Sequence, residues 1–367
     1  MAVEVYNHVA RTVTKEIVQR RIEALKTGQK MQDLPEELWQ ESFRFYVKED
    51  KTRRGGPNLR MIRLDPAKPS LTVTGFIFNK FVHPTENRFV TVREAALLQG
   101  FPDDMELKGS LTSTQRQVGN AVPVQLAEAV FRAVVSFARR VGYSHKELRA
   151  LSLFCGAGGL DIGASLPHDG EYHIRTLLAA DCWEDACASL RGYRGGETRV
   201  VKQDIAAVAD PLLFWQNGTG ETTAPDLVFG GPPCQAFSQA GKQKALDDER
   251  GQLVYDYLRY IERLRPAFFV MENVSNIVSV CGGKLYKDII RRMEDGGYNV
   301  TFGVLNAADY GAPQLRRRAI FIGCRKEMGR VPVPPATHSA ADGGSDLFGL
   351  APHVTVGEAF SGLPALE

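Results

Sequence analysis

The sequence predicts an α/β protein with a mostly parallel sheet and a second, smaller domain. Five short apolar runs recur along the chain, at 150–154, 175–180, 226–229, 267–271 and 319–323. Each run is separated from the next by a stretch long enough for a helix, and this alternation is typical of βαβ units. With 367 residues, the chain is long enough for one large domain and a smaller one.

Composition is that of an ordinary globular protein. Hydrophobic residues make up 44% of the chain and charged residues 24%. No apolar run reaches the roughly 18–20 residues that span a bilayer, and the N-terminal residues do not resemble a signal peptide. The six cysteines lack paired CxxC spacing, which argues against a zinc site or a disulfide framework. We therefore expect a cytoplasmic protein with reduced thiols, no bound metal and no membrane association.

The first 60 residues are expected to be helical and basic. Val18, Ile22 and Leu25 recur at helical spacing, Gly28 would end that helix, and Pro35 would open another. After Arg330 the chain has no lysine or arginine, so a phosphate-binding surface would have to use this front segment. A solvated charged helix face is the simpler alternative. The basic residues outside the apolar stripe and in the following loop are Lys15, Arg20, Arg21, Lys26, Lys51, Arg53 and Arg54.

A glycine-rich turn follows the first apolar run, in Leu151-Ser-Leu-Phe-Cys-Gly-Ala-Gly-Gly-Leu160. Gly156, Gly158 and Gly159 leave the backbone at the head of the next helix open to a ligand. Such a turn alone is shared by many nucleotide-binding proteins and by plain tight turns. The residues at the ends of the next strands therefore have to distinguish the two.

Acidic residues follow the next two apolar stretches. Asp181 ends the second run, where an acidic residue commonly holds ribose hydroxyls in this type of sheet. Asp204 follows a third apolar stretch, and Trp183 is close enough in sequence to pack against an adenine ring. For each carboxylate the alternative is a helix cap. Their order along the chain favours a nucleotide-type cofactor site.

The segment Pro225-Asp-Leu-Val-Phe-Gly-Gly-Pro-Pro-Cys-Gln-Ala-Phe-Ser238 places one cysteine just past a buried strand. A thiol at the carboxyl end of a strand lies where open α/β sheets place their reactive groups. Cys234 is therefore a candidate nucleophile, and the alternative is a small buried hydrophobe, the usual fate of a free cysteine.

Charged residues also occupy the ends of two later strands. Glu272 ends a buried strand, where a lone carboxylate is costly unless it has a partner or a function. Gln314, Arg316 and Arg318 precede the last apolar run at alternate positions, so we expect them to share one face of a strand.

Two motifs stand nearer the front of the chain. Residues 91–103, Thr-Val-Arg-Glu-Ala-Ala-Leu-Leu-Gln-Gly-Phe-Pro-Asp, predict a helix entry followed by a Phe-Pro stop. Residues 116–123, Arg-Gln-Val-Gly-Asn-Ala-Val-Pro, predict a Gly-Asn turn that enters a helix.

Taken together, the Pro-Pro-Cys-Gln, Glu-Asn-Val, Gln-x-Arg-x-Arg, Phe-x-Gly-x-Gly-Gly and Gly-Asn-Ala-Val-Pro elements resemble the DNA (cytosine-5)-methyltransferases. The resemblance covers most of residues 61–330. The motif order differs from that family, because the Arg-Glu-Ala and Gly-Asn-Ala-Val-Pro motifs come first here, at Arg93–Pro123, and not last. The resemblance therefore implies a circularly permuted member of the family.

The implied fold is a Rossmann-like, S-adenosylmethionine-dependent methyltransferase sheet with a small target-recognition domain. Residues 1–60 would belong to the target-recognition region, and 61–145 would be the permuted segment that completes the cofactor site. Residues 146–330 would form the catalytic domain. Residues 331–367 would be a connection and a tail that contributes to target recognition, so residues 116–123 would fold back beside 151–160.

The implied reaction is methyl transfer from S-adenosylmethionine to C5 of a cytosine that has been flipped out of double-stranded DNA. Cys234 would add to C6 of the base, and Glu272 would bond N3 and the exocyclic amine. Arg318 would contact O2, with Arg316 in support. By the same resemblance, the cofactor site would be lined by Phe154, Gly156, Gly158, Gly159, Asp181, Trp183, Asp204, Ile205, Pro232, Asn120 and Val122. The DNA contacts would come from Gln235, Ser238, Arg116, Lys51, Arg53 and Arg54.

We expect a DNA (cytosine-5-)-methyltransferase that acts on a specific sequence in a restriction–modification system. It would be a monomer in the bacterial cytoplasm, associated with the nucleoid, and would have a cognate endonuclease. Three alternatives stay open: an RNA (tRNA) cytosine-5 methyltransferase, a non-enzymatic DNA-binding relative, and a catalytic subunit that needs a partner for sequence recognition. The DNA sequence that it recognises cannot be predicted from the amino-acid sequence.

Overall fold

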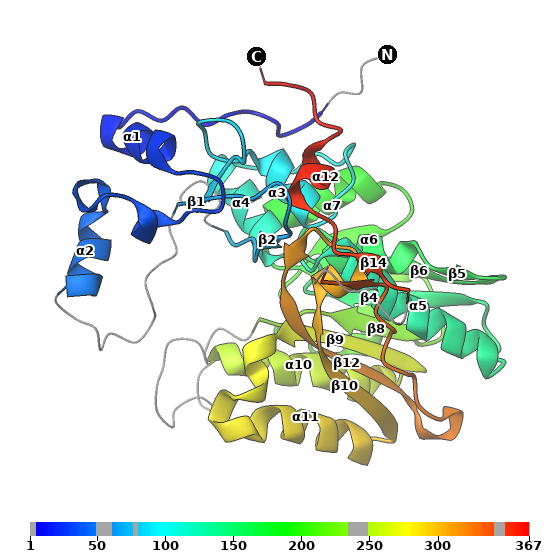
Figure 1. The fold of residues 1–367 in the computed structure, drawn as a ribbon. Coiled ribbons are helices and arrows are strands. Elements are labelled where there is room, and N and C mark those ends of the chain that lie inside the picture. The colour runs from blue at the N-terminus through cyan, green and yellow to red at the C-terminus, as the bar shows by residue number, and fades with distance from the viewer. Residues whose placement is uncertain (1–4, 49–60, 76–79, 234–248, 341–348, 367) are drawn as a thin grey trace. The chain divides into compact units, whose positions relative to one another are not determined.

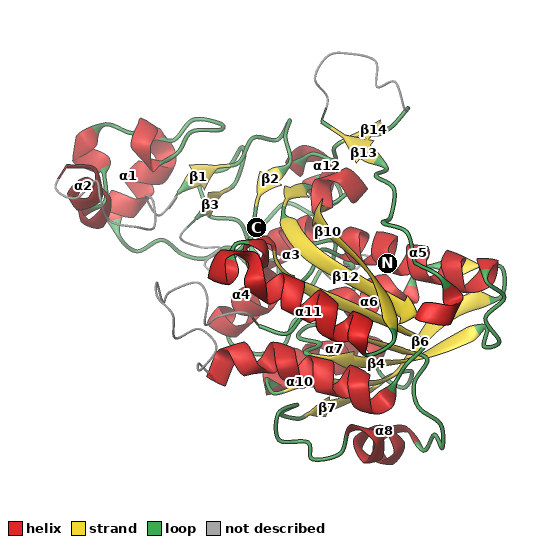
Figure 2. Ribbon diagram, turned by 90° about the horizontal axis from the view of Figure 1, so that it is seen from below, coloured by secondary structure: helices red, strands yellow, loops and turns green. Residues whose placement is uncertain are grey.

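The computed structural model describes residues 5–48, 61–75, 80–233, 249–340 and 349–366. It divides the chain into two compact units (Figures 1 and 2). The smaller unit consists of Met1–Asn120, Ala312–Leu315 and His353–Glu367, and the larger of Ala121–Gly311 and Arg316–Pro352. These boundaries differ from the expected ones.

The expected segment 61–145 is divided at Asn120, and the expected tail 331–367 is divided at Pro352. Hydrogen bonds explain the second difference. The hydroxyl of Thr301 donates to the carbonyl of Val331, and Thr337 N–H donates to the carbonyl of Asp309 at 2.9 Å. Residues 331–339 are thereby attached to the larger unit.

The larger unit contains an eight-stranded sheet in the order β10-β12-β9-β8-β4-β6-β5, with β7 also paired to β6. Five strands run parallel: β4 (Glu147–Leu153), β6 (Tyr172–Asp181), β7 (Arg199–Lys202), β8 (Leu227–Gly230) and β9 (Phe268–Val274). The strand β12 (Arg317–Arg325) is antiparallel to both β9 and β10 (Tyr298–Asn306), and the short β5 (His168–Asp169) is antiparallel to β6. Each of the five predicted apolar runs forms a strand of this sheet, so the predicted α/β class is confirmed.

Helices cover both faces of the sheet (Figure 2). On one face, a single buried cluster joins the strands to α8 (Pro211–Thr219), α10 (Glu249–Leu264) and α11 (Lys284–Asp295). The other face carries α5 (Val124–Arg140), α6 (Gly159–Ser165) and α7 (Glu184–Arg194). There Phe131 of α5 packs edge-on against Phe229 of β8, with ring centroids 4.9 Å apart. Because both faces are covered, the central strands are apolar at successive positions.

The smaller unit combines short helices with two-residue strand pairs. Its helices are α1 (Glu16–Ala24), α2 (Glu41–Lys48), α3 (Val92–Leu98), α4 (Leu111–Asn120) and α12 (Val356–Phe360), with the 3₁₀ turns η1 (Met31–Asp33) and η2 (Glu36–Leu38). Its parallel strand pairs are β1 (Ile62–Arg63) with β3 (Phe81–Val82), and β2 (Ser70–Leu71) with β11 (Gln314–Leu315). The larger unit also has β13 (His338–Ser339), β14 (Ala351–Pro352), η4 (Ser275–Val278), η5 (Val280–Gly283), η6 (Ala307–Tyr310) and η7 (Lys326–Met328).

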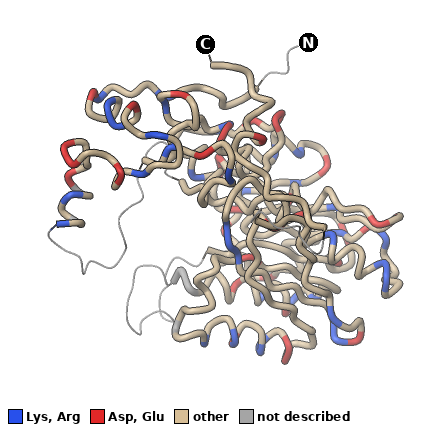
Figure 3. The backbone as a smooth tube through the Cα atoms, in the orientation of Figure 1, with Lys and Arg blue, Asp and Glu red and all other residues tan. Residues whose placement is uncertain are grey.

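Two expectations for the front segment are wrong in detail. Pro35 opens only the single turn η2, and the second α-helix begins at Glu41. Arg21 is buried and does not lie on a solvated face, because its guanidinium donates to the carbonyls of Leu38 and Trp39 at the end of η2. Both acidic and basic residues lie along α1 and α2 (Figure 3).

Segments from both ends of the chain meet at the start of α3. The side chain of Thr91 caps α3, and its hydroxyl lies 3.0 Å from Nδ1 of His8. The other ring nitrogen of His8 lies 3.1 Å from the carbonyl oxygen of Pro364. Within the same unit, Val356 N–H donates to the carbonyl of Lys68 at 2.9 Å. The helix α12 is thereby attached to the smaller unit.

Among the described residues, no single helix is long and apolar enough to cross a membrane.

Candidate active site

The predicted residues of the larger unit gather at one edge of its sheet. The strands β4, β6, β8 and β9 are parallel and all end at this edge, and the antiparallel β12 begins there. From β4 the chain proceeds to β6 on one side and later to β8 on the other, so the strand order switches beside β4. Open α/β sheets bind their ligands at such a switch point.

The turn after β4 exposes bare backbone at this point. Phe154, Gly156 and Gly158 have positive φ angles of 55°, 53° and 92°. A Cβ added to Gly156 would meet nothing within 4 Å, whereas one on Gly158 would lie 2.4 Å from Cδ1 of Leu190. Gly158 is therefore required for packing against α7. Gly156 leaves an open backbone position that fits a ligand approaching the turn.

The carboxylate of Asp181 joins this turn to the next one. Its Oδ2 accepts a hydrogen bond from Gly156 N–H at 2.9 Å, and its Oδ1 accepts one from Trp183 N–H, also at 2.9 Å. Each carboxylate oxygen has a second acceptor site, so the group can still accept a hydrogen bond from a ribose hydroxyl. Asp181 thus shapes the turn and keeps acceptor capacity for a ligand.

The other expected cofactor residues of the larger unit follow neighbouring strands. Asp204 is exposed after β7, and its Oδ1 accepts Ala206 N–H at 3.0 Å in a local turn, with no helix for it to cap. Ile205 is buried in the main core cluster, and Trp183 is half-buried at the start of α7. Pro232 is buried in the turn after β8.

The chain just after α4 lies directly on the glycine-rich helix. A Cβ added to Gly159 would be 2.3 Å from the carbonyl oxygen of Val122, and one on Gly163 would be 2.4 Å from Cβ of Ala127. The backbone of α6 is therefore in close contact with residues 122–127. For Val122, this confirms the expected return of the 116–123 segment to the 151–160 turn.

Arg116 and Asn120 differ from expectation. Both are exposed and lie in α4, so Arg116–Asn120 is helical and does not form a Gly-Asn turn. The role of Gly119 is close packing, because its Cβ would lie 2.1 Å from the backbone nitrogen of Gly75. Arg116 and Asn120 both belong to the smaller unit.

Glu272 and Arg318 form an ion pair at the end of β9. Nε of Arg318 lies 2.6 Å from Oε1 of Glu272. In the β9–β12 register Arg318 is opposite Val274 and Ile320 is opposite Glu272, so the two charged side chains share one face as diagonal neighbours. The pair is charge-assisted and largely removed from water, since Glu272 is only 8% exposed.

Burial and charge act in opposite directions on Glu272. Burial raises the pKa of its carboxyl above the usual range, while the positive charges of Arg318 and Arg316 lower it. Arg316 is itself buried, and burial lowers the pKa of its guanidinium. Two guanidinium groups thus face one buried carboxyl group at the sheet edge.

The turn that leads toward Cys234 is held by the end of β9. Nδ2 of Asn273 donates to the carbonyl of Pro232 at 3.0 Å. A Cβ on Gly231 would come within 3.0 Å of Oε2 of Glu272, so glycine allows the turn to approach that carboxylate. Sequence reasoning missed Asn273 and Gly231, although both stand inside the Glu-Asn-Val and Gly-Pro-Pro-Cys motifs.

Six of the predicted residues lie outside the described part of the chain: Cys234, Gln235, Ser238, Lys51, Arg53 and Arg54. Gln314 is described, but it does not share a face with Arg318. The strand breaks at Arg316, between β11 and β12, and the amide of Gln314 is bonded within the smaller unit.

A second buried carboxyl group lies next to the turn and was also missed. Asp161, in the first turn of α6, is buried beside Ser152 of β4. Burial raises the pKa of Asp161 to about 7. No metal-like cluster or special spacing marks Asp161 in the sequence, and only the packing of α6 on β4 removes it from water.

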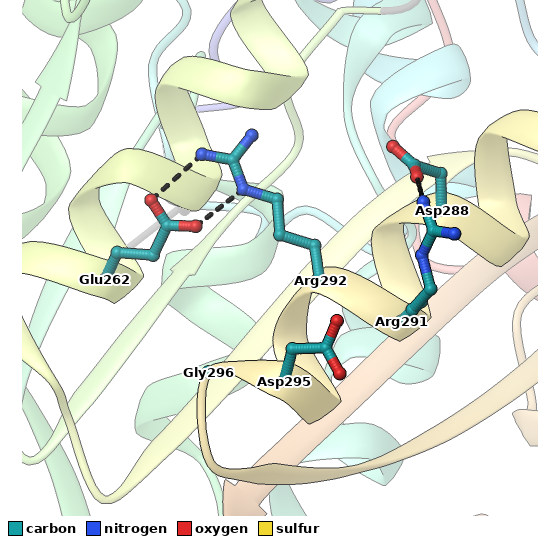
Figure 4. A pocket seen from close by; sticks show the side chains of 6 residues that line it. All are labelled: Glu262, Asp288, Arg291, Arg292, Asp295 and Gly296. Atoms are coloured by element: carbon teal, nitrogen blue, oxygen red, sulfur yellow. Dashed lines mark hydrogen bonds and ion pairs between the residues drawn. The ribbon is translucent and has the colours of Figure 1, made fainter.

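A polar hollow between α10 and α11 lies elsewhere (Figure 4). Both helices end near the opposite edge of the sheet, where β9 and β10 begin. Glu262 accepts two hydrogen bonds from Arg292, at 2.5 and 2.9 Å, and Asp288 accepts one from Arg291. No predicted site residue lines the hollow, and four of its charged side chains form the pairs Glu262–Arg292 and Asp288–Arg291.

Comparison with known proteins agrees with the motifs. A family model described as C-5 cytosine-specific DNA methylase matches residues 4–136 and 148–347. The Type II methyltransferase M.AquIA of Picosynechococcus sp. is 36% identical over 234 residues, which covers 59% of this chain and 90% of that protein. The Type II methyltransferase M1.HphI of Haemophilus parahaemolyticus is 36% identical over 213 residues, covering 58% of this chain and 55% of that protein.

Among solved structures, the S. pombe Dnmt2 methyltransferase is 20% identical, with a TM-score of 0.39, and covers 49% of this chain and 50% of that one. The chain spans about half the length of several curated relatives, such as M1.HphI and M.FnuDI of Fusobacterium nucleatum. The family match nevertheless takes in most of the chain, including the residues that build the sheet edge. The chain therefore belongs to the C-5 cytosine-specific DNA methylase family, with S-adenosylmethionine as its cofactor.

Proposed function

We propose that this chain methylates C5 of a cytosine within a specific sequence of double-stranded DNA, through a covalent bond between Cys234 and C6 of the base. The observation that supports this most is the Glu272–Arg318 ion pair beside the turn 231–233. The pair offers a buried carboxyl group and a guanidinium at the point where the chain enters Pro-Pro-Cys.

Cytosine C5 is a weak nucleophile, so electrons must first be pushed into the ring. The thiolate of Cys234 forms a bond to C6, and the electron pair of the C5–C6 double bond shifts toward C5 and N3. S-adenosylmethionine supplies the methyl group as an electrophile. Loss of the C5 proton and cleavage of the bond between sulfur and C6 then restore the aromatic ring and the free cysteine.

Glu272 stabilises the charge that this addition creates at N3. Burial raises the pKa of its carboxyl, which helps the group to take up a proton and share it with N3 as the charge develops, while a carboxyl oxygen accepts a hydrogen bond from the exocyclic amine. Arg318 keeps the carboxyl in place and supplies positive charge near O2, and Arg316 adds to that charge. The base has to leave the helical stack to reach these groups.

The cofactor would be held by the turn after β4 and by the residues that follow the neighbouring strands. The bare backbone at Gly156 and the spare acceptor sites of Asp181 suit a ribose-bearing ligand. Trp183 and Phe154 would supply apolar contacts, and Asn120 and Val122 would close the site from the permuted segment.

Circular permutation accounts for the motif order. The family model matches two segments, 4–136 and 148–347, on either side of the start of β4. The contact of Val122 with Gly159 is what a segment displaced in sequence but retained in space would make.

The relatives named above are Type II methyltransferases. We place this chain in the same kind of restriction–modification system, with a cognate endonuclease that cleaves the unmethylated sequence. Of the described parts of the expected recognition region, 5–48 and 353–366 belong to the smaller unit, and 331–340 and 349–352 belong to the larger one.

The test begins with the target. Bisulfite sequencing of DNA from cells that express the chain should reveal one methylated sequence, and a duplex with 5-fluorocytosine at that position should then trap the protein. We expect a species stable to denaturing electrophoresis that needs S-adenosylmethionine and is absent for Cys234→Ala. Normal methylation by Cys234→Ala would overturn the mechanism, and methylation of RNA but not DNA would overturn the substrate.

A further inference from the structure

We propose that Gln99 and Gln314 form a buried amide clasp that positions the strand leading to Arg316 and Arg318. The inference rests on the proposed function, since it makes both glutamines positioning residues for methyl transfer. Neither glutamine touches the reacting atoms. The spacing of the motifs alone predicts a positioning role for neither of them.

The amide of Gln314 is fully buried and forms hydrogen bonds through both its nitrogen and its oxygen. Its Nε2 donates to the carbonyl of Leu98 at 2.8 Å and to Oε1 of Gln99 at 2.7 Å, and its Oε1 accepts Val73 N–H at 2.9 Å. Both donor hydrogens and one acceptor site are therefore engaged, at 0% exposure. An amide in this position links the strand segment after β2 with the end of α3.

Gln99 extends the clasp to a third element. It is also 0% exposed, and its Nε2 donates to the carbonyl of Val118 near the end of α4. Val118 stands two residues before Asn120, one of the expected cofactor residues. Because Gln314 in turn contacts Gln99, a single pair of side chains connects the ends of α3 and α4 with β11.

Backbone pairing holds the same strand. Ser70 N–H donates to the carbonyl of Pro313 at 2.9 Å, and the hydroxyl of Thr72 donates to the carbonyl of Leu315 at 2.8 Å. The chain therefore leaves the smaller unit at Leu315 in a defined position, and the next residue is Arg316.

Beyond the clasp, the strand is held by the site itself. Arg316 N–H donates to Oδ1 of Asn306 at 3.1 Å, its carbonyl accepts Ala307 N–H at 2.9 Å, and Arg318 pairs with Glu272. Residues 314–318 thus run from the clasp at one end to the proposed base-binding pair at the other. A change in the position of Gln314 acts on Arg316 and Arg318 through four residues of chain.

The chemistry of an amide is specific here. A glutamate at position 314 has no donor for Leu98 or Gln99 when ionised, and its negative charge would face two oxygen atoms. A protonated glutamate regains one donor. Methionine fills the space but leaves Val73 N–H and the carbonyl of Leu98 buried without this partner. The clasp therefore predicts a pH-dependent defect for Gln314→Glu and a pH-independent one for Gln314→Met.

The experiment compares Gln314→Glu, Gln314→Met, Gln99→Glu and the double glutamate variant with the wild type across pH 6–8.5. We expect kcat for DNA methylation to fall by roughly 10- to 100-fold at pH 8, because small displacements of catalytic groups have effects of that size. KM should change much less, and kcat of Gln314→Glu should recover in part toward pH 6. The double variant places two buried carboxyl groups in contact and should be the most impaired at pH 8. Gln216→Glu, on α8 of the larger unit, serves as the matched control and should keep wild-type kcat.

The clasp can also be tested by a measurement that does not depend on methyltransferase activity. Amide hydrogen exchange should accelerate in peptides that cover 69–75 and 312–318 in Gln314→Glu, and not in Gln216→Glu. Wild-type kcat per folded molecule in both Gln314 variants, or unchanged exchange in these peptides, would overturn the proposal. If the wild type itself does not methylate DNA, the proposed function fails, and the exchange result alone decides whether the clasp exists.

Discussion

Oδ2 of Asp181 accepts the N–H of Gly156 at 2.9 Å, so a carboxylate at the end of β6 fixes the backbone of the turn after β4. The two residues are 25 positions apart in the sequence: Asp181 ends β6, and Gly156 follows the adjacent parallel strand β4. The bond makes the shape of the proposed cofactor turn depend on a side chain from the neighbouring strand.

Asp181→Asn should therefore weaken cofactor binding. The amide retains one acceptor oxygen but presents an N–H₂ group to one of two backbone N–H donors, which loses a hydrogen bond to a charged acceptor. We expect the Kd for S-adenosylmethionine to rise about 10-fold, as measured by isothermal titration calorimetry. Asp185→Asn, on the following helix, is the control and should bind normally. Equal affinity for wild type and Asp181→Asn would show that the bond does not shape the site.

The two glycines of the turn should fail in different ways. Gly159→Ala places a Cβ 2.3 Å from the carbonyl oxygen of Val122, so it should separate α6 from residues 122–127 and lower the melting temperature. Gly156→Ala meets no atom within 4 Å, and its cost is the positive φ of 53°, about 1 kcal/mol. It should remain folded and bind S-adenosylmethionine weakly, because the methyl group fills the open position. Thermal unfolding and calorimetry on both variants separate the two effects, and a reversed pattern would contradict this account of the turn.

Glu272→Gln should abolish most of the methyl transfer while leaving the cofactor affinity unchanged. The amide cannot form the ion pair with Arg318 or carry the proton for N3, and losses of this kind are roughly 100- to 1,000-fold in kcat. Single-turnover methylation is the measurement, with S-adenosylmethionine binding as the control. Arg318→Lys keeps the charge but loses the planar guanidinium, so it should show a smaller defect. A Glu272→Gln variant with normal kcat would remove the carboxyl from the mechanism.

Asp161 should make the protein less stable as the pH rises. Its pKa is about 7 in the folded chain, against a value of 3.8 when the group is free of these surroundings. Below pH 3.8 Asp161 is protonated in both the folded and the unfolded state. Between pH 3.8 and pH 7 it is ionised in the unfolded state but keeps its proton in the folded state. The free energy of unfolding therefore falls as the pH rises from 3.8 to 7. We expect Asp161→Asn to flatten this dependence and to gain on the order of 2 kcal/mol at pH 8. Denaturant unfolding at several pH values tests it, and an unchanged slope would show that Asp161 is not protonated.

Replacement of Lys51, Arg53 and Arg54 by alanine should weaken DNA binding on every sequence. Each lost phosphate contact removes about one unit from the slope of log K against log salt, so the slope should become shallower. Binding titrations between low and moderate salt measure it. Replacing Arg291 of α11 and Lys326 of η7, which lies near the opposite edge of the sheet, should have no such effect. An unchanged slope for the loop variant would exclude that loop from the phosphate contacts.

Local pattern was sufficient for the strands and for the motifs. The five apolar runs form strands because a parallel sheet that is covered on both faces requires apolar residues at successive positions. Such runs can be recognised in the sequence. Glu272 and Asp181 could be assigned to strand ends for the same reason. The alternation of strands and helices then placed the ends of β4, β6, β8 and β9 at one edge, before any contact was known.

Contacts between distant segments could not be predicted from local sequence pattern. The periodicity placed Arg21 outside the apolar stripe of its helix and Gln314 on one strand face with Arg318. Both are buried because carbonyl groups or an amide of other segments satisfy their polar groups. Gly119 was expected in a turn, yet it lies in a helix where Gly75 approaches its backbone. The sequence by itself determined the family and the sheet and supplied the residues of the proposed chemistry, since these depend on residue types near strand ends. Tertiary structure decided which polar side chains hold the site together, because a buried donor or acceptor takes its partner from whatever segment packs against it.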